Sequence, residues 1–384
     1  MNLEPIVALG GGHGAHAMAA DLTLAGHEVR LCEHPKFTER FRATMEGGEI
    51  ELTGIGRTGK ARPAMVTTDF ARALTGAKLV NLCIPAFGHD LFFEAMLPYL
   101  TSDHVVVVWA GDFGALRLAH MLARRRSKSR PVILEGSTLP YGTRLSGPAR
   151  VDMLLFANPI LVAALPASET KHWPEALKTL WPGVKPAAHA LQAAFANPNP
   201  IVHPPGALLS VGRVEYSKGD FYMYREGMGP ATRRVIYGLF QDSVAVAKRL
   251  GFTIPGYPKE YFDKPASIMG EVFECPGDRY EVIANVKGPS TLQDRYLTED
   301  LPCGLLPISQ LGDKLGVPTP TIDAIIQFGS LVCEQDFWRN GRSLKSLGLD
   351  TMEPKDIMAY VKTGAPSSTR PRKTAAKKTA KKRR

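Results

Sequence analysis

Short apolar runs alternate with segments of helical periodicity through the first half of the chain. Each apolar run is only a few residues long and ends at a glycine, a proline or a polar residue, as buried strands do. The predicted strands are Pro5–Leu9, Glu28–Cys32, Ile50–Leu52, Ala64–Thr67, Lys78–Ile84, His104–Trp109 and Pro131–Glu135. The predicted helices are His13–Ala25, Asp90–Leu100 and Leu116–Arg125. This alternation predicts a doubly wound, parallel α/β sheet with helices on both faces.

The second half of the chain shows longer helical periodicity. Pro230–Leu250 places apolar side chains on one face, and Thr321–Asp336 is a second stretch of this kind. Between the halves, Phe195–Pro205 is rich in Asn and Pro and is predicted to be a connecting loop. The pattern therefore predicts a Rossmann-type α/β domain, a mainly helical domain and a tail, over residues 1–190, 191–364 and 365–384.

Length and composition agree with an ordinary globular protein of two domains. A chain of 384 residues exceeds what one hydrophobic core usually serves, and its apolar content is 44%. The longest apolar runs, such as Val105–Ala110, are far too short for membrane insertion. The first residues show no basic segment ahead of an apolar core, so we expect no export signal.

Cysteine usage points to a reducing compartment. The five cysteines are scattered and lack CxxC spacing: Cys32, Cys83, Cys275, Cys303 and Cys333. Such a pattern argues against a disulfide framework and against a structural zinc site. We expect reduced thiols, a cytoplasmic location and no bound metal.

The net charge of +10 is concentrated at the C-terminus. Nine Lys or Arg and no acid lie between Arg370 and Arg384, which leaves a net charge of +1 for the rest of the chain. A low-complexity basic segment of this kind is predicted to be disordered. It could contact nucleic acid or anionic membrane surfaces non-specifically, or serve only as a solubilising tail.

A glycine-rich turn lies between the first predicted strand and helix. Gly10-Gly11-Gly12-His13-Gly14-Ala15 satisfies the pattern G-x-G-x-x-A of dinucleotide-binding folds. In such a turn Gly10 permits the tight bend, Gly12 lets the backbone approach a pyrophosphate, and Ala15 keeps the helix close to the sheet. The helix N-terminus at His13 and Gly14 supplies amide donors to the phosphates. A glycine turn in an unrelated α/β fold is the alternative interpretation.

Two further positions bear on the cofactor. Glu33 ends the second predicted strand, where a carboxylate accepts hydrogen bonds from an adenosine ribose and repels a 2′-phosphate. This favours NAD, although the neighbouring His34 and Lys36 leave NADP open. Pro85 follows a later strand at the edge of the sheet where doubly wound folds bind ligands. Its alternative role is to terminate that strand.

Three segments resemble the octopine/nopaline (opine) dehydrogenase family. They are the fingerprint LGGGHGAHAMAADLTLAGHEV, the segment NPNPIVHPPGALL from Asn197 to Leu209, and the segment DRYLTEDLPCGLLPISQLGDKLGVPTPTIDAI from Asp294 to Ile325. The resemblance covers nearly the whole chain up to about residue 364. It implies a Rossmann domain followed by a helical opine dehydrogenase domain, with the active site in the cleft between them.

The same resemblance implies roles for four residues. His203 and Asp300 match the family's catalytic pair, Arg295 matches the residue that receives the carboxylate of the 2-oxo acid, and Glu135 matches an acid near the amino-substrate pocket. These residue types suit the chemistry of opine formation, in which an amino acid condenses with a 2-oxo acid and the imine is reduced by hydride from the nicotinamide. A histidine can exchange protons near neutral pH, a carboxylate can fix its tautomer, and an arginine binds carboxylates in bidentate fashion.

Other interpretations of the same residues stay open. His203 could be a structural histidine among prolines, Asp300 could cap a turn, and Arg295 could be a surface cation. Asp323 at a predicted helix start is interpreted as structural, and His13 and His16 as residues held by packing. At the level of function, the alternatives are a 2-hydroxy-acid dehydrogenase or ketoacid reductase that uses no amine, and a nucleotide-sensing or nucleic-acid-associated protein that uses the tail. A homodimer is also left open.

Overall fold

An eight-stranded sheet forms the first half of the molecule. In the computed structural model, which describes residues 2–365, its strands follow the order β12-β11-β8-β7-β6-β1-β2-β5. All neighbouring strands are parallel except β8 and β11, which are antiparallel. The strands are β1 (Ile6–Leu9), β2 (Val29–Cys32), β5 (Met65–Thr67), β6 (Leu79–Leu82), β7 (Val105–Val108), β8 (Val132–Gly136), β11 (Ile160–Leu165) and β12 (Val184–Pro186).

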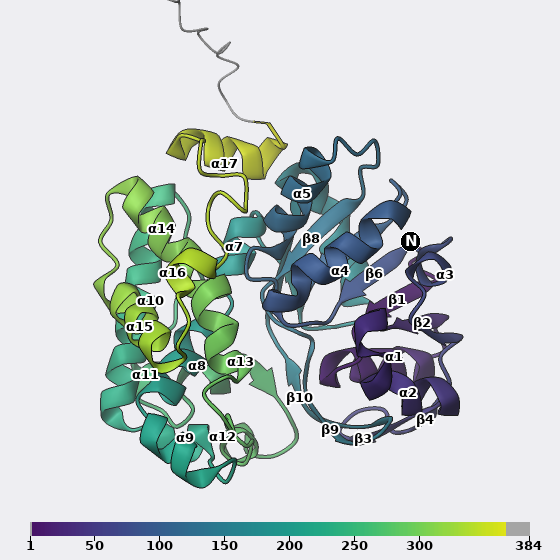
Figure 1. Cartoon of the computed structure of the whole chain (residues 1–384), viewed down its shortest axis with the longest axis horizontal. Coiled ribbons are helices and arrows are strands. Elements are labelled where there is room, and N and C mark those ends of the chain that lie inside the picture. Colours follow the sequence, from purple (N-terminus) through teal and green to yellow (C-terminus); the bar gives the residue numbers. More distant parts are fainter. Residues whose placement is uncertain (1, 366–384) are drawn as a thin grey trace, which may run out of the picture.

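Helices cover both faces of this sheet, as Figure 1 shows. Alternate residues of each central strand belong to two separate apolar clusters: Val106 and Val108 point to one face, and Val105 and Val107 to the other. Burial on both faces explains why these strands are continuous apolar runs. The covering helices are α1 (His13–Leu24), α2 (Thr38–Gly47), α3 (Phe70–Leu74), α4 (His89–Met96), α5 (Gly114–Arg124) and α6 (Trp173–Lys178), with short turns η1 (Pro35–Phe37), η2 (Ala86–Gly88), η3 (Leu97–Tyr99) and η4 (Ala167–His172).

A second, smaller sheet was not predicted from the sequence. It has the order β13-β10-β3-β4, and β9 also pairs with β10. The prediction that residues 50–52 extend the main sheet was therefore wrong, because this strand pairs with β10, about a hundred residues later. Periodicity identifies a strand but not its partner. The strands are β3 (Ile50–Gly54), β4 (Gly59–Ala61), β9 (Tyr141–Gly147), β10 (Arg150–Ala157) and β13 (Phe273–Glu274).

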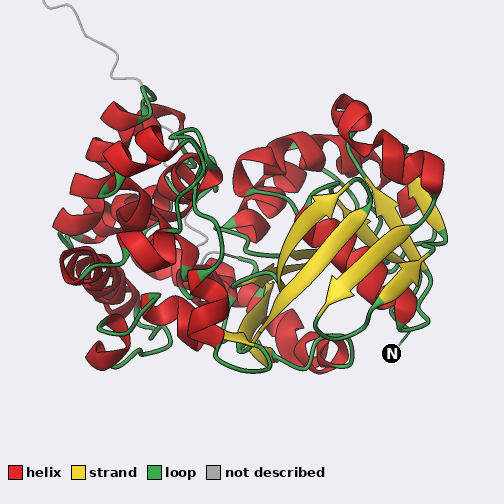
Figure 2. Cartoon of the chain, turned by 90° about the horizontal axis from the view of Figure 1, so that it is seen from below, coloured by secondary structure: helices red, strands yellow, loops and turns green. Residues whose placement is uncertain are grey.

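The second half of the molecule is helical, and Figure 2 shows it beside the strands of the first half. Its long helix α10 (Pro230–Leu250) has the bounds that periodicity predicts. The other helices are α7 (Ala190–Phe195), α8 (Asn199–Leu208), α9 (Val211–Ser217), α11 (Lys259–Phe262), α12 (Arg279–Ala284), α13 (Arg295–Thr298), α14 (Leu306–Leu315), α15 (Pro320–Val332), α16 (Phe337–Asn340) and α17 (Pro354–Thr363), together with η5 (Met223–Gly227), η6 (Ser267–Glu271) and η7 (Asp300–Leu305).

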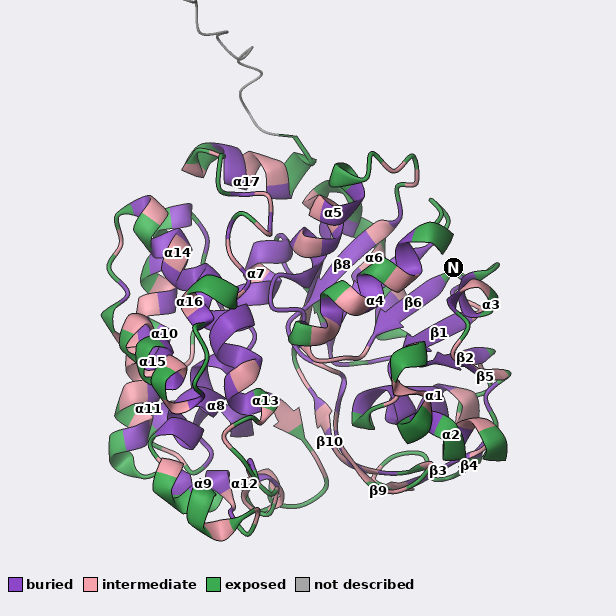
Figure 3. Ribbon diagram, viewed as in Figure 1, coloured by how far each residue is buried: buried purple, intermediate pink, exposed green. Residues whose placement is uncertain are grey.

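The segment predicted as a connecting loop is largely helical, which corrects that prediction. Helix α8 begins at Asn199 and contains Pro204 and Pro205, which cannot donate main-chain hydrogen bonds. All its residues from Pro200 to Leu208 are buried, and Figure 3 shows the helix in the interior. Burial of this helix among its neighbours outweighs its poor helix propensity.

The C-terminal residues return to the first half. Helix α17 packs against η4 as well as against α10, so the chain ends its described part where the two halves meet (Figure 1). We retain the division near residue 190 as a proposal. Within residues 2–365, no helix combines the length and apolar character needed to cross a membrane. The predicted basic tail lies outside the described residues.

Candidate active site

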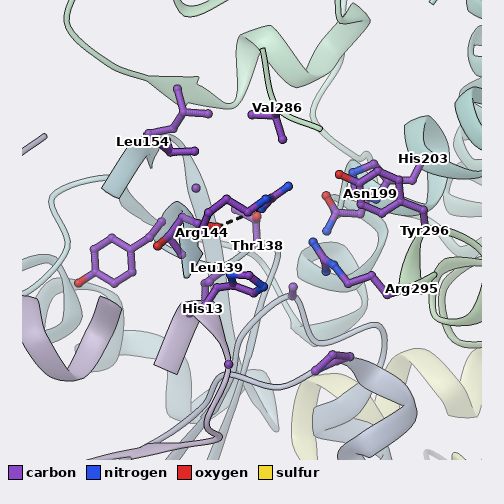
Figure 4. Close-up of a pocket in the computed structure, with 18 of the residues that line it drawn as sticks. His13, Thr138, Leu139, Arg144, Leu154, Asn199, His203, Val286, Arg295 and Tyr296 are labelled. Carbon is purple, nitrogen blue, oxygen red and sulfur yellow. Dashed lines mark hydrogen bonds between the residues drawn. The ribbon is translucent and has the colours of Figure 1, made fainter. Parts of the chain in front are cut away.

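A cavity of about 530 Å³ lies where residues of both halves meet, and Figure 4 shows its principal side chains. The α/β half contributes the glycine turn, the end of β6 and strand β9. The helical half contributes α8, η5 and α13. The volume of the cavity lies within the ordinary range of small-molecule sites.

His203 on α8 is held by three neighbours within this cavity. Its Nδ1 lies 2.8 Å from Oδ2 of Asp300, the first residue of η7. Its Nε2 lies 2.9 Å from the hydroxyl oxygen of Tyr224, and the ring of Tyr296 stacks on the imidazole with centroids 4.0 Å apart. His203 and Asp300 are only 3% and 2% exposed. The structure thus brings together two residues that are nearly a hundred positions apart in the sequence.

Burial controls the charge of this pair. Burial first, and then the nearby Arg295 guanidinium, lower the pKa of His203 to about 3 against the opposing effect of Glu299. Burial also raises the pKa of Asp300 well above its ordinary value. Each effect disfavours the charged form of the group concerned, so the imidazole of His203 is neutral at pH 7. In the hydrogen bond between the two residues we assign the imidazole hydrogen to Nδ1, which leaves the lone pair of Nε2 toward Tyr224.

Arg295 starts helix α13 and faces the cavity with a side chain that is 44% exposed. Its Nη1 lies 3.4 Å from Oε2 of Glu299, whose other oxygen accepts a 2.8 Å hydrogen bond from the backbone N–H of Ala86. Glu299 therefore links the predicted carboxylate-binding arginine to the segment after β6. Pro85, the residue before Ala86, also lines the cavity.

Arg144 on strand β9 is a second arginine that faces the cavity. Its Nη1 donates to the carbonyl oxygen of Thr143 at 3.0 Å, and within residues 2–365 no carboxylate forms an ion pair with it. In Figure 4, Arg144 and Arg295 enter from two sides of the cavity, with His13 below Arg144. A guanidinium without an acidic partner at a cavity wall is suited to bind an anionic ligand.

The glycine turn has the geometry that a dinucleotide phosphate requires. Gly10 has φ +118°, and a Cβ there would lie 2.7 Å from Cγ2 of Ile84. At Gly12 no atom lies within 4 Å of an added Cβ, so the backbone borders open space, as a cradle for a pyrophosphate must. Ala15 is fully buried beneath the turn. The residues present therefore fit a dinucleotide.

His13 and Gly14 also line the cavity at the start of α1. Nδ1 of His13 accepts a 2.6 Å hydrogen bond from the backbone N–H of Leu145 on β9. Burial lowers the pKa of His13 to about 4, and Arg144 contributes to this decrease. The imidazole is therefore neutral at pH 7 and adds no charge to the cavity.

Glu33 ends β2 beside the glycine turn. Its carboxylate accepts a 2.6 Å hydrogen bond from the backbone N–H of His34 and lies against Gly11. Burial raises the pKa of Glu33. Among the described residues that line the cavity Glu33 is absent, so it borders the turn rather than the space in front of His203.

Glu135 has a different position from the one expected. Its carboxylate accepts hydrogen bonds from the backbone N–H groups of Phe113 and Ala115, at 2.8 Å and 2.7 Å, at the start of α5. It is not among the described residues that line the cavity, and its assignment to an amino-substrate pocket stays a prediction. Instead it stabilises a strained loop, in which Asp112 and Phe113 have φ +46° and +69°.

Two residues interpreted as structural have structural partners. Asp323 accepts hydrogen bonds from the hydroxyls of Ser309 and Thr319, at 2.7 Å and 3.0 Å. His16 lies 2.9 Å from the hydroxyl oxygen of Thr44 and is buried.

Comparisons with known proteins agree with the geometry. Residues 186–333 match the family model described as "NAD/NADP octopine/nopaline dehydrogenase, alpha-helical domain". The opine dehydrogenase of Arthrobacter sp. (strain 1C) is 28% identical over 357 residues, which cover 92% of this chain and 97% of that relative. Residues 186–333 thus match the helical domain of the octopine/nopaline (opine) dehydrogenase family, and nearly the whole chain is similar to opine dehydrogenases. This confirms the resemblance found in the sequence.

Solved structures share the fold of this chain. An octopine dehydrogenase with NADH and L-arginine aligns with a TM-score of 0.70 at 20% identity, covering 95% of this chain and 99% of its own. A yersinopine dehydrogenase with NADP⁺ aligns with a TM-score of 0.66 at 18% identity, covering 93% and 97%. The predicted fold class, a Rossmann domain followed by a helical opine dehydrogenase domain, is confirmed. The matched helical domain and the opine dehydrogenase relatives together indicate that the chain is an NAD(P)-dependent oxidoreductase that acts on a CH–NH group.

Sequence reasoning missed three polar residues of this opine dehydrogenase site. Arg144 lies on a strand that was not predicted, so no pattern marked it. Tyr224 lies in η5, between the segments that carry the family resemblance. Glu299 precedes Asp300 directly, and its position within the resembling segment was the one signal that could have drawn attention to it.

Proposed function

We propose that this opine dehydrogenase condenses the amino group of an amino acid with a 2-oxo acid, and reduces the imine to a secondary amine that carries two carboxylates. The observation that carries the proposal is the pair of arginines, Arg144 and Arg295, that face one cavity beside His203. An opine has a carboxylate on each side of its new amine. Two guanidinium groups on separate walls therefore match the product.

We assign the 2-oxo acid carboxylate to Arg295 and the amino acid carboxylate to Arg144. Arg295 belongs to the same short segment as Asp300, so it holds the oxo acid next to the His203 pair. Arg144 lies on β9, the strand that also contacts His13 at the end of the glycine turn. A bidentate contact at each end would orient the amine toward the carbonyl carbon and so lower the entropic part of the barrier.

The glycine turn would hold the cofactor, which supplies the hydride. Gly10, Gly12, His13, Gly14 and Ala15 shape the phosphate site, and Pro85 borders the neighbouring space. Glu33 supports NAD(H) as the favoured cofactor, because a buried carboxylate beside the turn disfavours a 2′-phosphate. NADP stays open, since His34 and Lys36 follow Glu33 closely in the sequence.

His203 would exchange protons with the reacting groups, and Asp300 would fix its tautomer. A neutral imidazole with a buried carboxylate partner can accept a proton and hold it as an ion pair with that carboxylate. Opine formation needs both directions, since the amine must lose a proton and the carbinolamine oxygen must gain one. The same pair therefore serves two steps.

A ketoacid reductase is the main alternative within the same fold. Its 2-hydroxy acid product has a single carboxylate to bind beside the new hydroxyl, so it would leave one of the two arginines without a role. The nucleic-acid-associated alternative depends on the tail beyond residue 365. Contact of that tail with anionic polymers, a homodimer and a cytoplasmic location stay predictions; the location is supported by five cysteines that form no disulfide.

The test is an NADH-oxidation matrix that crosses pyruvate, 2-oxoglutarate and oxaloacetate with the standard amino acids. We expect turnover only when a 2-oxo acid and an amino acid are both present. Product mass spectrometry should show a secondary amine that combines the two carbon skeletons. Equal oxidation rates with the 2-oxo acid alone would contradict the proposal and identify a ketoacid reductase.

A further inference from the structure

The hydroxyl group of Tyr224 lies within hydrogen-bond distance of Nε2 of His203, the ring nitrogen that does not contact Asp300. Tyr224 lies in η5, lines the cavity and is 5% exposed. Its oxygen lies 2.9 Å from Nε2 of His203. The sequence offered no sign of this contact, because 21 positions separate the two residues and none of the recognised motifs includes Tyr224.

Both ring nitrogens of His203 are engaged in this arrangement. Nδ1 pairs with Asp300 at 2.8 Å, and Tyr296 covers a face of the ring. Because Asp300 accepts the hydrogen of Nδ1, Nε2 has only a lone pair to offer, and the hydroxyl of Tyr224 donates to it. The phenol oxygen then keeps its own lone pairs for a donor in the cavity.

We propose that Tyr224 is the group that contacts the amine and relays protons between it and His203. The inference rests on the proposed function and adds a third member, Tyr224, to the pair of His203 and Asp300. The phenol oxygen takes a proton from the substrate ammonium while its own proton passes to Nε2. The imidazolium formed is stabilised by the carboxylate of Asp300.

The protons moved by the relay balance over the whole condensation. The ammonium loses one proton through Tyr224, and the free amine forms the N–C bond with the carbonyl carbon of the 2-oxo acid. One N–H proton moves to the carbonyl oxygen, which gives the carbinolamine. His203 returns its proton through Tyr224 to this oxygen, the C–O bond breaks and water leaves, so the imine is formed protonated. A nicotinamide cofactor held at the glycine turn would supply the hydride that reduces this imine to the secondary amine, with no further proton required.

The surroundings favour a relay over a free phenolate. Burial raises the pKa of Tyr224 well above its ordinary value, with Tyr296 as a further cause. The hydroxyl therefore keeps a proton at all times and passes one on only as it receives another. The arginines and carboxyl groups that surround Tyr224, His203 and Asp300 are Arg144, Arg295, Asp112, Asp294 and Glu299.

The test is the variant Tyr224→Phe, which removes the hydroxyl and keeps the ring in place. At pH 7 we expect kcat for the condensation to fall by about 10²-fold, the lower end of the usual worth of a proton-transfer group. The loss should shrink as the pH rises and the amino acid becomes unprotonated in solution, because the first transfer is then no longer needed. NADH affinity, measured by fluorescence titration, should stay unchanged.

Tyr257→Phe is the matched control, since Tyr257 is a partly buried phenol that packs on Phe240 and does not line the cavity. It should leave kcat at every pH as in the parent enzyme. A Tyr224→Phe loss that is the same at every pH would indicate a structural role and overturn the relay, as would an unchanged kcat at pH 7. If the parent enzyme shows no amino-acid-dependent turnover, the proposed function itself fails, and the relay fails with it.

Discussion

Two helices border the cavity, and they are built in opposite ways. Helix α1 follows a glycine turn, is rich in alanine and has exactly the start that the sequence predicts at His13. Helix α8 contains three prolines within ten residues, and the sequence predicted a loop there. Each nevertheless presents functional groups to the same cavity: His13 and Gly14 from α1, after Gly12 of the turn, and His203 from α8.

The two helices differ in what stabilises them: local interactions stabilise α1, and contacts with distant segments of the chain stabilise α8. In α1 the turn and the helix propensity act within one short stretch of chain, so the phosphate site can be recognised from the sequence. In α8 a proline in the helix interior costs about 3 kcal/mol, while full burial of a side chain such as Val202 contributes about 1.5–3 kcal/mol. Several buried side chains offset the prolines, and only the packed structure supplies that burial.

The largest expected effect separates the two helices by function. His203→Ala should lower kcat by about 10²–10⁴-fold, because a positioned proton-transfer group is removed. NADH affinity should barely change, because the phosphates lie at the α1 turn. Asp300→Asn should cause a similar or smaller loss, and the double variant should fall short of the product of the two. Steady-state kinetics at matched NADH saturation would check this, and a near-native kcat for His203→Ala would make it a structural histidine.

The α1 turn should respond in the opposite way. Gly12→Ala has an allowed φ of −92° and meets no atom, so the fold should be as stable as before, while NADH affinity should fall at least tenfold, about 1.4 kcal/mol. Gly10→Ala instead places a Cβ against Ile84 at φ +118° and should lower stability by about 1–3 kcal/mol. Thermal unfolding and fluorescence titration separate the two effects. Unchanged NADH affinity in Gly12→Ala would place the phosphates elsewhere.

The two arginines should divide the substrates between them. Arg295→Lys should raise KM for the 2-oxo acid by about tenfold, and Arg144→Lys should raise KM for the amino acid similarly, as a point charge replaces a bidentate contact. Arg150→Lys, on the neighbouring strand and 3.8 Å from Glu51, is the control that should change neither. If Arg144→Lys weakened NADH binding instead, Arg144 would serve the cofactor phosphates.

The smallest effect concerns stability and pH. Burial raises the pKa of Glu135 from its ordinary 4.5 to about 7, so the folded state holds this proton more tightly than the unfolded chain. Its contribution to stability is full below pH 4.5 and is lost as the pH rises through about 7. Relative to Glu135→Gln, the parent protein should therefore lose Tm between pH 5 and 8. A constant difference in Tm across this range would show that Glu135 does not titrate there.

The sequence by itself determined the elements whose energetics are local. The strands β1, β2 and β5 to β8 of the main sheet, the turn from Gly10 to Ala15 and the amphipathic helix α10 can each be recognised from neighbouring residues, since turn geometry and periodic burial act over a few positions. Strands β11 and β12 of the same sheet were not predicted. His203, Asp300 and Arg295 were identified only because they match motifs of a known family. Neither the local periodicity nor the family motifs predicted which residues these three side chains contact.

Only the tertiary structure decided how the substrate side of the cavity is assembled. Arg144 reaches the cavity because β9 pairs with β10 in a second sheet, and Tyr224 meets His203 because α8 and η5 pack together. The tertiary structure also places the Glu135 carboxylate outside the cavity lining, where it accepts a hydrogen bond at the start of α5. These outcomes depend on contacts between distant segments, whose free energy comes from burial and hydrogen bonding in the folded chain and has no signature in the local order of residues.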